Sequence, residues 1–312
     1  MRGLEDQDER RTPSSVACGD TFSLWEKEEG GRTKKAERET PGMATLRAAL
    51  AVLLIVPVTL IGMPLQWLGQ RLGFGWSRRL PNLYHRYLNR VLGVRRIVHG
   101  TPCADRPLLL TPNHASWLDI TILGAVLPVA FVSKAEVGGW PLIGTLARLQ
   151  GTIFIDRTRR HATGAVSSAL AERLASGEAV ALFAEGTSSD GTRVLPFRSS
   201  LLGAAIAAEA DVVWVQPVAI SYARLHGLPL GRASRFRVAW YGDLDLAPHL
   251  WGVLKDGAVD VLVTFGEPIR VDSAADRKRI AREAEAEVRR LHASAMRGRV
   301  AAPQVAKQAA LH

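Results

Sequence analysis

An uncharged run of 18 residues, from Ala48 to Leu65, constrains this chain more than any other feature of its sequence. Thr59 is the only polar side chain in the run. A helix that spans the ~30 Å hydrocarbon core of a membrane needs about 20 residues, so the run lies at the lower limit of that length. Pro57 and Pro64 are expected to kink such a helix. A secretory signal peptide is the alternative, but no clean small-x-small cleavage site follows, which favours a retained membrane helix.

Basic and aromatic residues follow this run directly. Between Gln66 and Arg96 the sequence has seven arginines and no acidic residue. The aromatic side chains of this stretch are Trp67, Phe74, Trp76, Tyr84 and Tyr87. Arginines that meet lipid phosphates and aromatics at the headgroup level predict a membrane-surface helix, and the basic side predicts the cytoplasmic face. A solvated basic helix packed on the protein is the alternative.

The first 42 residues differ in composition from the rest of the chain. They hold 8 Lys+Arg and 10 Asp+Glu among frequent Gly, Ser, Thr and Pro, which predicts a disordered tail. Because a short basic flank and the apolar run follow Met43, we expect Met43 to be the native start. The net charge is +10 for the whole chain and +12 without this tail. That excess predicts an anionic partner, and its position beside the apolar run favours membrane lipids over nucleic acid.

After Gly100 the sequence alternates between short β-rich runs and helical stretches. The expected strands are PLLLTPNH (107–114), VAFVSK (129–134), GTIFIDR (151–157), AVALFAEG (179–186), VVWVQPVAISY (212–222), FRVAWYG (236–242) and VDVLVTFGEPI (259–269). The expected helices are Trp117–Leu127, Trp140–Leu149, His161–Ser176 and Leu201–Glu209. The alternation predicts an α/β fold with a mostly parallel sheet covered by helices, preceded by an N-terminal membrane-associated helical segment.

The expected organisation has four parts: a tail (1–42), a membrane anchor with basic interfacial helices (43–99), an α/β domain (100–272), and a C-terminal surface helix with a tail (273–312). The helix of the last part runs from Ala274 to Arg297, with Asp272 or Ser273 as its expected N-cap. Cys18 and Cys103 are the only cysteines, which excludes a disulfide scaffold and a thiolate metal site.

The first candidate for chemistry is the segment Asn113–Asp119, which directly follows an expected strand. Histidine suits a general base near neutral pH, and a carboxylate on its other ring nitrogen fixes the tautomer. Five residues on a helix separate two side chains by ~140°, so His114 and Asp119 pair only if His114 lies in the loop and Asp119 in the first helical turn. Ser116-x-x-Asp119 is also a capping-box pattern, in which His114 is an ordinary loop residue.

Two further segments follow expected strands. Glu185-Gly186-Thr187 combines a glycine that permits close backbone approach with a hydroxyl that can donate to an anion, at a strand end where ligands gather in α/β sheets. Arg157 ends the segment Gly151–Arg157 and can hold a phosphate with two hydrogen bonds. Taken alone, an ordinary polar turn and a surface charge are the simpler interpretations of these two segments.

Together the blocks NHxSxxD (113–119), GxxFIxR (151–157), EGT (185–187) and VxPVAI (215–220) resemble the glycerolipid acyltransferase family, which includes the bacterial lysophosphatidate acyltransferases. The resemblance covers roughly Pro107 to Ile269. It implies that part 100–272 is an acyltransferase domain, and that a hydrophobic segment precedes it.

The resemblance also implies roles for individual residues. His114, the histidine of an HxxxxD motif, would take the proton from the acceptor hydroxyl, and Asp119 would orient it. The hydroxyl oxygen would attack the thioester of acyl-CoA or acyl-carrier protein as co-substrate, with no metal, no cofactor and no acyl-enzyme. The expected binding residues for the acceptor head group are Arg157, Glu185, Gly186 and Thr187, with Lys134 and Arg198 as further basic candidates.

The third block departs from the family pattern PEGTR, because Ala184 and Ser188 replace its proline and arginine. Either Arg193 or Arg198 substitutes for that arginine, or the acceptor has no glycerol phosphate. Stretches such as SKAEVGGWPLIGTLARLQ (133–150) also resemble lyso-ornithine lipid acyltransferases, which acylate a hydroxy-fatty-acyl oxygen on an aminolipid. We expect 1-acylglycerol-3-phosphate as acceptor, because that activity is commoner in the family, with lyso-ornithine lipid as the alternative.

The sequence therefore predicts a membrane-bound O-acyltransferase of phospholipid synthesis on the inner membrane, with its catalytic domain on the cytoplasmic side. Its expected partners are membrane lipids, a lysolipid acceptor and the acyl donor, and no nucleic acid. A nucleic-acid-binding module is disfavoured because no helix-turn-helix or zinc pattern occurs. A hydrolase that uses Ser116 or Ser188 with His114 is disfavoured because Ser116 lies only two residues from His114 and fits a helix cap better than a nucleophile.

Overall fold

The computed structural model describes residues 41–155, 170–206, 212–272 and 274–299. The chain divides into two compact units, Met1–Leu46 and Arg47–His312, and each is described by itself. Of the first unit only residues 41–46 are described, and they are helical. The expected tail therefore lies almost entirely outside the described residues. The second unit contains the sheet and the candidate site.

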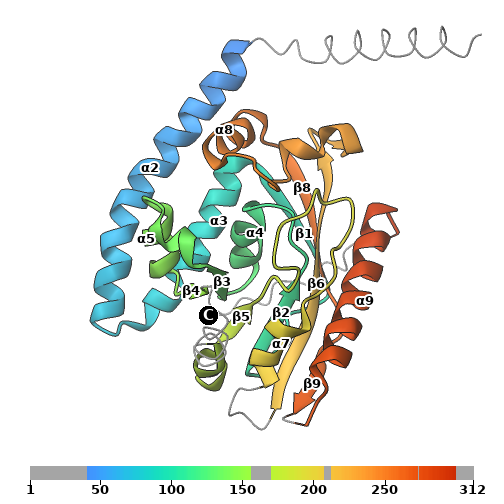
Figure 1. Cartoon of the computed structure of the whole chain (residues 1–312). Coiled ribbons are helices and arrows are strands. Elements are labelled where there is room, and N and C mark those ends of the chain that lie inside the picture. Colours follow the sequence, from blue (N-terminus) through green and yellow to red (C-terminus); the bar gives the residue numbers. More distant parts are fainter. Residues whose placement is uncertain (1–40, 156–169, 207–211, 273, 300–312) are drawn as a thin grey trace, which may run out of the picture. The chain divides into compact units, whose positions relative to one another are not determined.

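A sheet of nine strands, counted over the described residues, forms the centre of the second unit (Figure 1). The strands are β1 (Val94–His99), β2 (Leu108–Pro112), β3 (Ala130–Lys134), β4 (Ile153–Ile155), β5 (Ala179–Ala181), β6 (Val212–Leu225), β7 (Leu228–Pro229), β8 (Val259–Phe265) and β9 (Ile269–Asp272). Their order is β1-β8-β6-β2-β5-β3-β4, and β7 and β9 also pair with β6. All described pairings are parallel except those of β6 with β7, β8 and β9. The predicted mostly parallel sheet is confirmed.

The central strands supply side chains to two hydrophobic cores, one on each face of the sheet. In β2, Leu108 and Leu110 join one core and Leu109 joins the other. The run from Ala179 to Ala184 divides in the same alternating way. Successive side chains of a strand point to opposite faces, so a strand buried on both faces must be apolar at nearly every position. This explains why the sequence of β2 reads Leu-Leu-Leu.

Helices cover both faces. The first core includes residues of α3 (Leu80–Leu92), α4 (Leu118–Val126) and α8 (Leu246–Asp256). The second includes residues of α7 (Ser199–Ile206), α9 (Arg277–Met296) and the helical segment 170–175. Apart from the long N-terminal helix described next, the remaining described helices are short: η1 (Gly75–Arg78), η2 (Ala135–Gly139), α5 (Ile143–Leu149) and η3 (Arg232–Arg237). Of the expected helix His161–Ser176, residues 161–169 lie outside the described residues.

The helix α2 (Pro41–Arg71) is the one helix in the described part that is long and apolar enough to cross a membrane. It continues through Pro57 and Pro64. From Arg47 onward, its buried positions are small or polar residues, namely Ala48, Ala51, Thr59, Gln66 and Gly69. Its large apolar side chains are exposed, with Leu53 at 67% and Ile61 at 70%. Membrane helices pack through small and polar residues and leave large apolar side chains to the lipid, so this distribution indicates membrane association.

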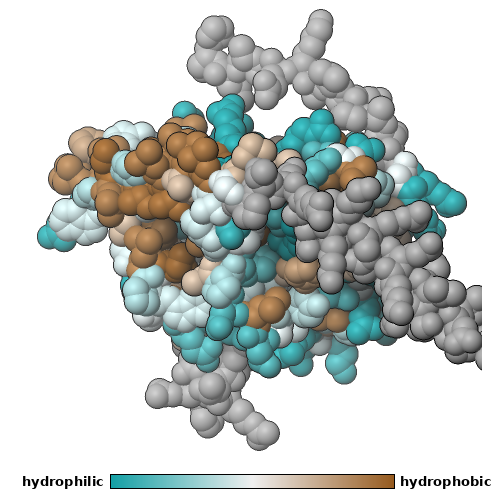
Figure 2. Space-filling view, turned by 90° about the horizontal axis from the view of Figure 1, so that it is seen from above, coloured by the Kyte–Doolittle hydropathy of each residue, from teal (hydrophilic) through white to brown (hydrophobic). Residues whose placement is uncertain are grey.

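The exposed apolar side chains form a continuous surface. Figure 2 shows the largest hydrophobic area on the side of the molecule where α2 lies. Polar contacts hold the opposite side of α2 to the rest of the unit. Arg47 donates to the carbonyls of Leu254 at 2.7 Å and Leu92 at 3.1 Å, and Gln66 Nε2 donates to the carbonyl of Leu149 at 3.0 Å. The helix is thus fixed to the protein by one face and unpartnered on the other.

Three sequence expectations about single elements are wrong. The expected helix up to Arg96 ends at Leu92, because Gly93 adopts φ +74° as a left-handed cap and Val94–His99 pairs with β8. The expected strand 236–242 is the end of η3 and a loop, since its backbone bonds locally or to the loop after β2. The C-terminal helix has Asp276 as its N-cap, with a hydrogen bond from Lys278 N at 2.9 Å. Asp272 instead ends β9.

We expect Ala51→Leu to destabilise the protein, because Ala51 is 5% exposed in the packed side of α2 and added methylenes in a packed site cost about 1–3 kcal/mol. Thermal unfolding in detergent micelles measures the effect. Leu53→Ala is the matched control on the exposed side, and we expect it to change stability by less than about 0.5 kcal/mol. An equal loss in both variants would contradict the assignment of the two faces.

Candidate active site

The loop between β2 and α4 brings His114 and Asp119 together. His114 lies in the loop, and Asp119 lies in the first turn of α4. Their side chains meet directly, with 2.9 Å between His114 Nδ1 and Asp119 Oδ2. The geometric condition set by their five-residue spacing is therefore met. The Nε2 atom of His114 is the ring nitrogen left for a substrate, and the side chain is 18% exposed.

The carboxylate of Asp119 is fully buried and accepts hydrogen bonds on both oxygens. Oδ2 also accepts from the backbone N–H groups of Ala115 at 2.7 Å and Ser116 at 2.9 Å. Oδ1 accepts from the hydroxyl of Tyr222 at 2.6 Å. A buried carboxylate is tolerated only with such partners. One side chain thus pairs with His114 and also accepts from the backbone of Ser116, whereas the N-cap residue of α4 is Trp117, which makes no side-chain capping bond.

The hydroxyl of Tyr222 is a fixed donor to this carboxylate. Tyr222 is fully buried, and burial together with the negative charge of Asp119 raises its pKa well above the usual value. The phenol therefore keeps its proton at neutral pH. Sequence analysis gave Tyr222 no role, since it lies about a hundred residues beyond Asp119 and only the pairing of β2 with β6 brings them together.

Three other contacts hold the loop in place. Asn113 binds the backbone of β6 twice, accepting from Ile220 N at 2.7 Å and donating to Ile220 O at 3.0 Å. The carbonyl of His114 accepts from Ser189 N at 2.9 Å. The imidazole ring stacks on Phe183, with 4.0 Å between ring centroids. Backbone and ring are thus both constrained, which leaves little freedom for His114.

Ser116 does not face a substrate. It is fully buried, and its hydroxyl accepts from Leu118 N at 3.3 Å at the start of α4. The hydrolase alternative that used Ser116 as nucleophile has no support in this geometry.

Glu185 lies directly beneath the backbone of His114. Its Oε1 accepts from His114 N at 3.1 Å, while its Oε2 is buried and has no partner among the described residues. Burial raises the pKa of Glu185 to about 8, against the lowering effect of its backbone hydrogen bonds. The carboxyl is therefore mostly protonated at neutral pH.

Of the other predicted binding residues, some lie beside Glu185 and others do not. Gly186 has φ +77°, and a Cβ there would come within 2.9 Å of Arg198 Nε, so Arg198 lies against the turn that contains Glu185. Thr187 is exposed beside them. Lys134 is exposed at the end of β3, and no described hydrogen bond or ion pair joins it to this cluster. Arg157 lies outside the described residues, two positions beyond β4.

No group of three or more His, Cys, Asp or Glu side chains is arranged for metal binding within the described residues. What the geometry offers is a buried carboxylate, an oriented imidazole and a protonated carboxyl at the carboxyl end of a parallel sheet. This arrangement suits proton transfer to and from a hydroxyl.

Comparison with known proteins identifies the family of the chain. A family model described as Acyltransferase matches residues 93–221, a range that includes His114, Asp119 and Glu185. The chain is 49% identical over 261 residues to the lyso-ornithine lipid O-acyltransferase of Brucella abortus (strain 2308), covering 82% of this chain and 98% of that protein. It is 45% identical over 258 residues to the lyso-ornithine lipid O-acyltransferase of Rhizobium meliloti (strain 1021), covering 81% and 88%.

Two more distant similarities are to acyltransferases that act on 1-acylglycerol phosphate. The 1-acyl-sn-glycerol-3-phosphate acyltransferase of Neisseria gonorrhoeae is 34% identical over 168 residues, which is 53% of this chain and 62% of that protein. The crystal structure of the 1-acyl-sn-glycerophosphate acyltransferase of Thermotoga maritima superimposes with a TM-score of 0.57 over 81% of this chain and 97% of that one. At 20% identity, this likeness concerns the fold alone. The chain belongs to the acyltransferase family, and the resemblance stated from its motifs is confirmed.

We expect the contribution of Glu185 to the stability of the protein to fall as the pH rises from about 4.5 to about 8. The carboxyl of Glu185 is protonated in the folded chain up to about pH 8, whereas it ionises near pH 4.5 once unfolded. The unfolded state therefore loses its proton first, and the stabilisation present below pH 4.5 is lost through that window. In the Glu185→Gln variant, this contribution to the pH dependence of the free energy of unfolding should vanish. Denaturant unfolding at pH 5.5 and pH 8 measures both proteins, and identical slopes would contradict the buried, protonated carboxyl.

Proposed function

We propose that this acyltransferase moves an acyl chain from a thioester to the free hydroxyl of a lysolipid, and that the acceptor is a lyso-ornithine lipid. The observation that carries the proposal is the His114–Asp119 pair, held at 2.9 Å at the end of β2 with Nε2 free. The identity of the acceptor is inferred from the relatives of Brucella abortus and Rhizobium meliloti, whose alignments with this chain cover most of their length.

In the proposed reaction, Nε2 of His114 takes the proton of the acceptor hydroxyl as its oxygen attacks the carbonyl carbon of the thioester. The carbon–sulfur bond then breaks, and the departing thiolate takes the proton back from the imidazolium. Asp119 holds the Nδ1 proton of His114 and stabilises the imidazolium that forms in between. Tyr222, by its bond to Oδ1, keeps the carboxylate in the plane that the ring requires. The hydroxyl is itself the nucleophile, so no acyl-enzyme forms.

The binding roles proposed from the family pattern remain part of this proposal. Gly186, Thr187 and Arg198 lie beside Glu185 and would contact the acceptor head group. Lys134, at the end of β3, and Arg157, which lies outside the described residues, are proposed as further contacts on the family pattern. Because the raised pKa of Glu185 keeps it mostly uncharged at neutral pH, it would not repel an anionic substrate. The acyl donor is proposed to be acyl-CoA or acyl-carrier protein.

The proposed location is the inner membrane, with the catalytic unit on its cytoplasmic side. α2 supports this, because its exposed side is apolar from Leu46 to Leu68 while its inner side is tied to the domain. The arginines that follow α2 suit the headgroup region of the cytoplasmic leaflet. A lysolipid would then enter sideways from the bilayer.

A lysophosphatidate acceptor is the second candidate. It is favoured by the relative from Neisseria gonorrhoeae and by its frequency in the family. The replacement of the PEGTR arginine by Ser188 speaks against it, since that position is where an arginine would meet a phosphate.

We expect His114→Ala to lower acyl transfer by about 10²–10⁴-fold, the usual contribution of a general base. Product formation from a radiolabelled acyl donor measures the rate, and sedimentation with vesicles shows that membrane binding is kept. His226→Asn is the matched control: His226 is an exposed histidine at a turn with φ +53°, a conformation that asparagine tolerates. Normal transfer by His114→Ala would refute the mechanism.

The acceptor is tested with purified protein, both donors and both lysolipids. We expect acylation of lyso-ornithine lipid to exceed that of lysophosphatidate in kcat/KM by about tenfold or more, as a site built for one polar group rejects an analogue without it. Mass spectrometry of the lipid products measures both reactions in one mixture. Exclusive formation of phosphatidate would establish the second candidate instead.

A further inference from the structure

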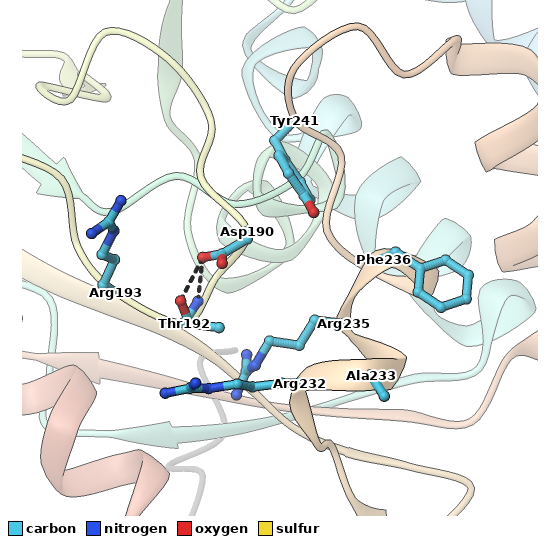
Figure 3. Close-up of a pocket in the computed structure, with 8 residues that line it drawn as sticks. All are labelled: Asp190, Thr192, Arg193, Arg232, Ala233, Arg235, Phe236 and Tyr241. Carbon is cyan, nitrogen blue, oxygen red and sulfur yellow. Dashed lines mark hydrogen bonds between the residues drawn. The ribbon is translucent and has the colours of Figure 1, made fainter. Parts of the chain in front are cut away.

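A cavity of about 660 Å³ lies beside the loop of His114. Its walls come from two segments that are far apart in sequence, the 190–193 loop after β5 and the 232–241 segment that includes η3. Figure 3 shows Asp190 and Thr192 on one wall, Arg232 and Arg235 below them on the other, and the ring of Tyr241 above. The remaining lining residues are Arg193, Ala233 and Phe236.

The charges of this cavity form no direct ion pair with one another. Among the ion pairs between described residues, none includes Asp190, Arg193, Arg232 or Arg235. Arg235 is only 7% exposed, and its guanidinium donates hydrogen bonds to neutral groups, the carbonyl of Gly191 at 2.8 Å and the sulfur of Met296 at 3.7 Å. The charge of Asp190 acts on Arg235 without direct contact. An arginine stays charged in a protein, and a buried charge without a directly bonded counter-ion is costly. The cavity therefore favours an anionic group near Arg235.

Asp190 places a negative charge in the same cavity. Its Oδ1 accepts from Thr192 N at 2.9 Å and from Thr192 Oγ1 at 2.7 Å, which fixes the carboxylate (Figure 3). Burial opposes its ionisation, but these hydrogen bonds and the charges of Arg193 and Arg235 outweigh burial and lower its pKa. No described residue donates to Oδ2. That oxygen is free to accept from a cation of a ligand.

Both walls are bonded directly to the loop that holds His114. Ser189, the residue before Asp190, donates from N and Oγ to the carbonyl of His114. Trp240, the residue before Tyr241, donates from its N to the carbonyl of Ala115 at 2.8 Å. A Cβ on Gly191 would lie 3.3 Å from the Cβ of Ala115. A ligand in this cavity is therefore held at a fixed position relative to the proposed general base.

The rim of the cavity is apolar. Phe236 is 60% exposed and Tyr241 is 37% exposed, although both line a site whose floor is charged. A polar floor with aromatic side chains at its opening suits an amphipathic ligand, whose head group enters while its chains stay outside.

We propose that this cavity binds the zwitterionic head group of the acceptor lipid, with its carboxylate on Arg232 and Arg235 and its ammonium group on Asp190. The inference rests on the proposed function and names the part of the chain that recognises the acceptor. An ornithine attached through its α-amine keeps one carboxylate and one side-chain ammonium, which match the two signs of charge on the walls. A lysophosphatidate carries only negative charge, so Asp190 would repel it. Asp190 is thus the residue that discriminates between the two acceptors.

The test uses two soluble analogues of the head group, called fragments here, together with the two lysolipids. Nα-acetylornithine carries both charged groups, and Nα-acetylnorvaline lacks the ammonium. We expect Asp190→Asn to weaken binding of the first fragment about tenfold or more, the scale of one charge-assisted hydrogen bond, and to leave the second fragment unchanged. Isothermal titration calorimetry measures both. The same variant should raise KM for lyso-ornithine lipid by a similar factor without raising KM for lysophosphatidate.

Arg232→Gln provides an independent variant, because Arg232 is exposed and its loss leaves the fold intact. It should weaken both fragments, since both carry the carboxylate. Asp243→Asn is the matched control, an exposed aspartate on the same segment that does not line the cavity. Acylation of lyso-ornithine lipid with no effect of Asp190→Asn or Arg232→Gln would overturn the cavity assignment and leave the proposed function standing. If the unmodified enzyme acylates only lysophosphatidate, the proposed function fails, and failure of Nα-acetylornithine to bind would then overturn the cavity assignment as well.

Discussion

The buried carboxylate of Asp119 is the interaction on which the rest of the site depends. This carboxylate belongs to the first turn of α4, and three of its four hydrogen bonds come from the loop after β2 and one from Tyr222 near the end of β6. Burying a carboxylate away from water costs a large free energy unless all of these donors are in place. The carboxylate therefore forces the strand, the helix and the loop into one arrangement. That arrangement also orients His114, so stability and reactivity have the same source.

The order of the strands makes this convergence possible. β2 lies between β5 and β6 and runs parallel to both, so the segments that follow β2 and β5 emerge at the same edge of the sheet. β6 is longer than its neighbour, and its last residues pass beyond the end of β2. For that reason Ile220 meets Asn113, and Tyr222 reaches Asp119. The site is a consequence of unequal strand lengths in a parallel sheet.

Local pattern was enough to predict much of this arrangement. Apolar runs bounded by polar turns predicted β2, β3, β5 and β6. The motif spacing allowed His114 and Asp119 to pair under one condition, and the family resemblance implied that they do. What local pattern does not contain is the long-range partner of a group. The sequence around Tyr222 predicts only the end of an apolar strand. The sequence of Val94–His99 continues that of a basic helix, and only its pairing with β8 shows that it is a strand. The segment 236–242 has strand-like composition, but its backbone partners are Ala115 and its own turn.

The net charge of the chain and the charge of the cavity describe different contacts. The excess of +12 after residue 42 is concentrated beside α2, where it faces no acidic residue nearby in sequence, and it acts over the whole headgroup region of a membrane. Such a field attracts any anionic lipid and cannot select one. Selection requires opposite charges at fixed positions, as Asp190 and Arg235 provide at the cavity. A chain that is basic overall must therefore keep an acidic group inside its binding site if it is to prefer a zwitterionic head group over a phosphate.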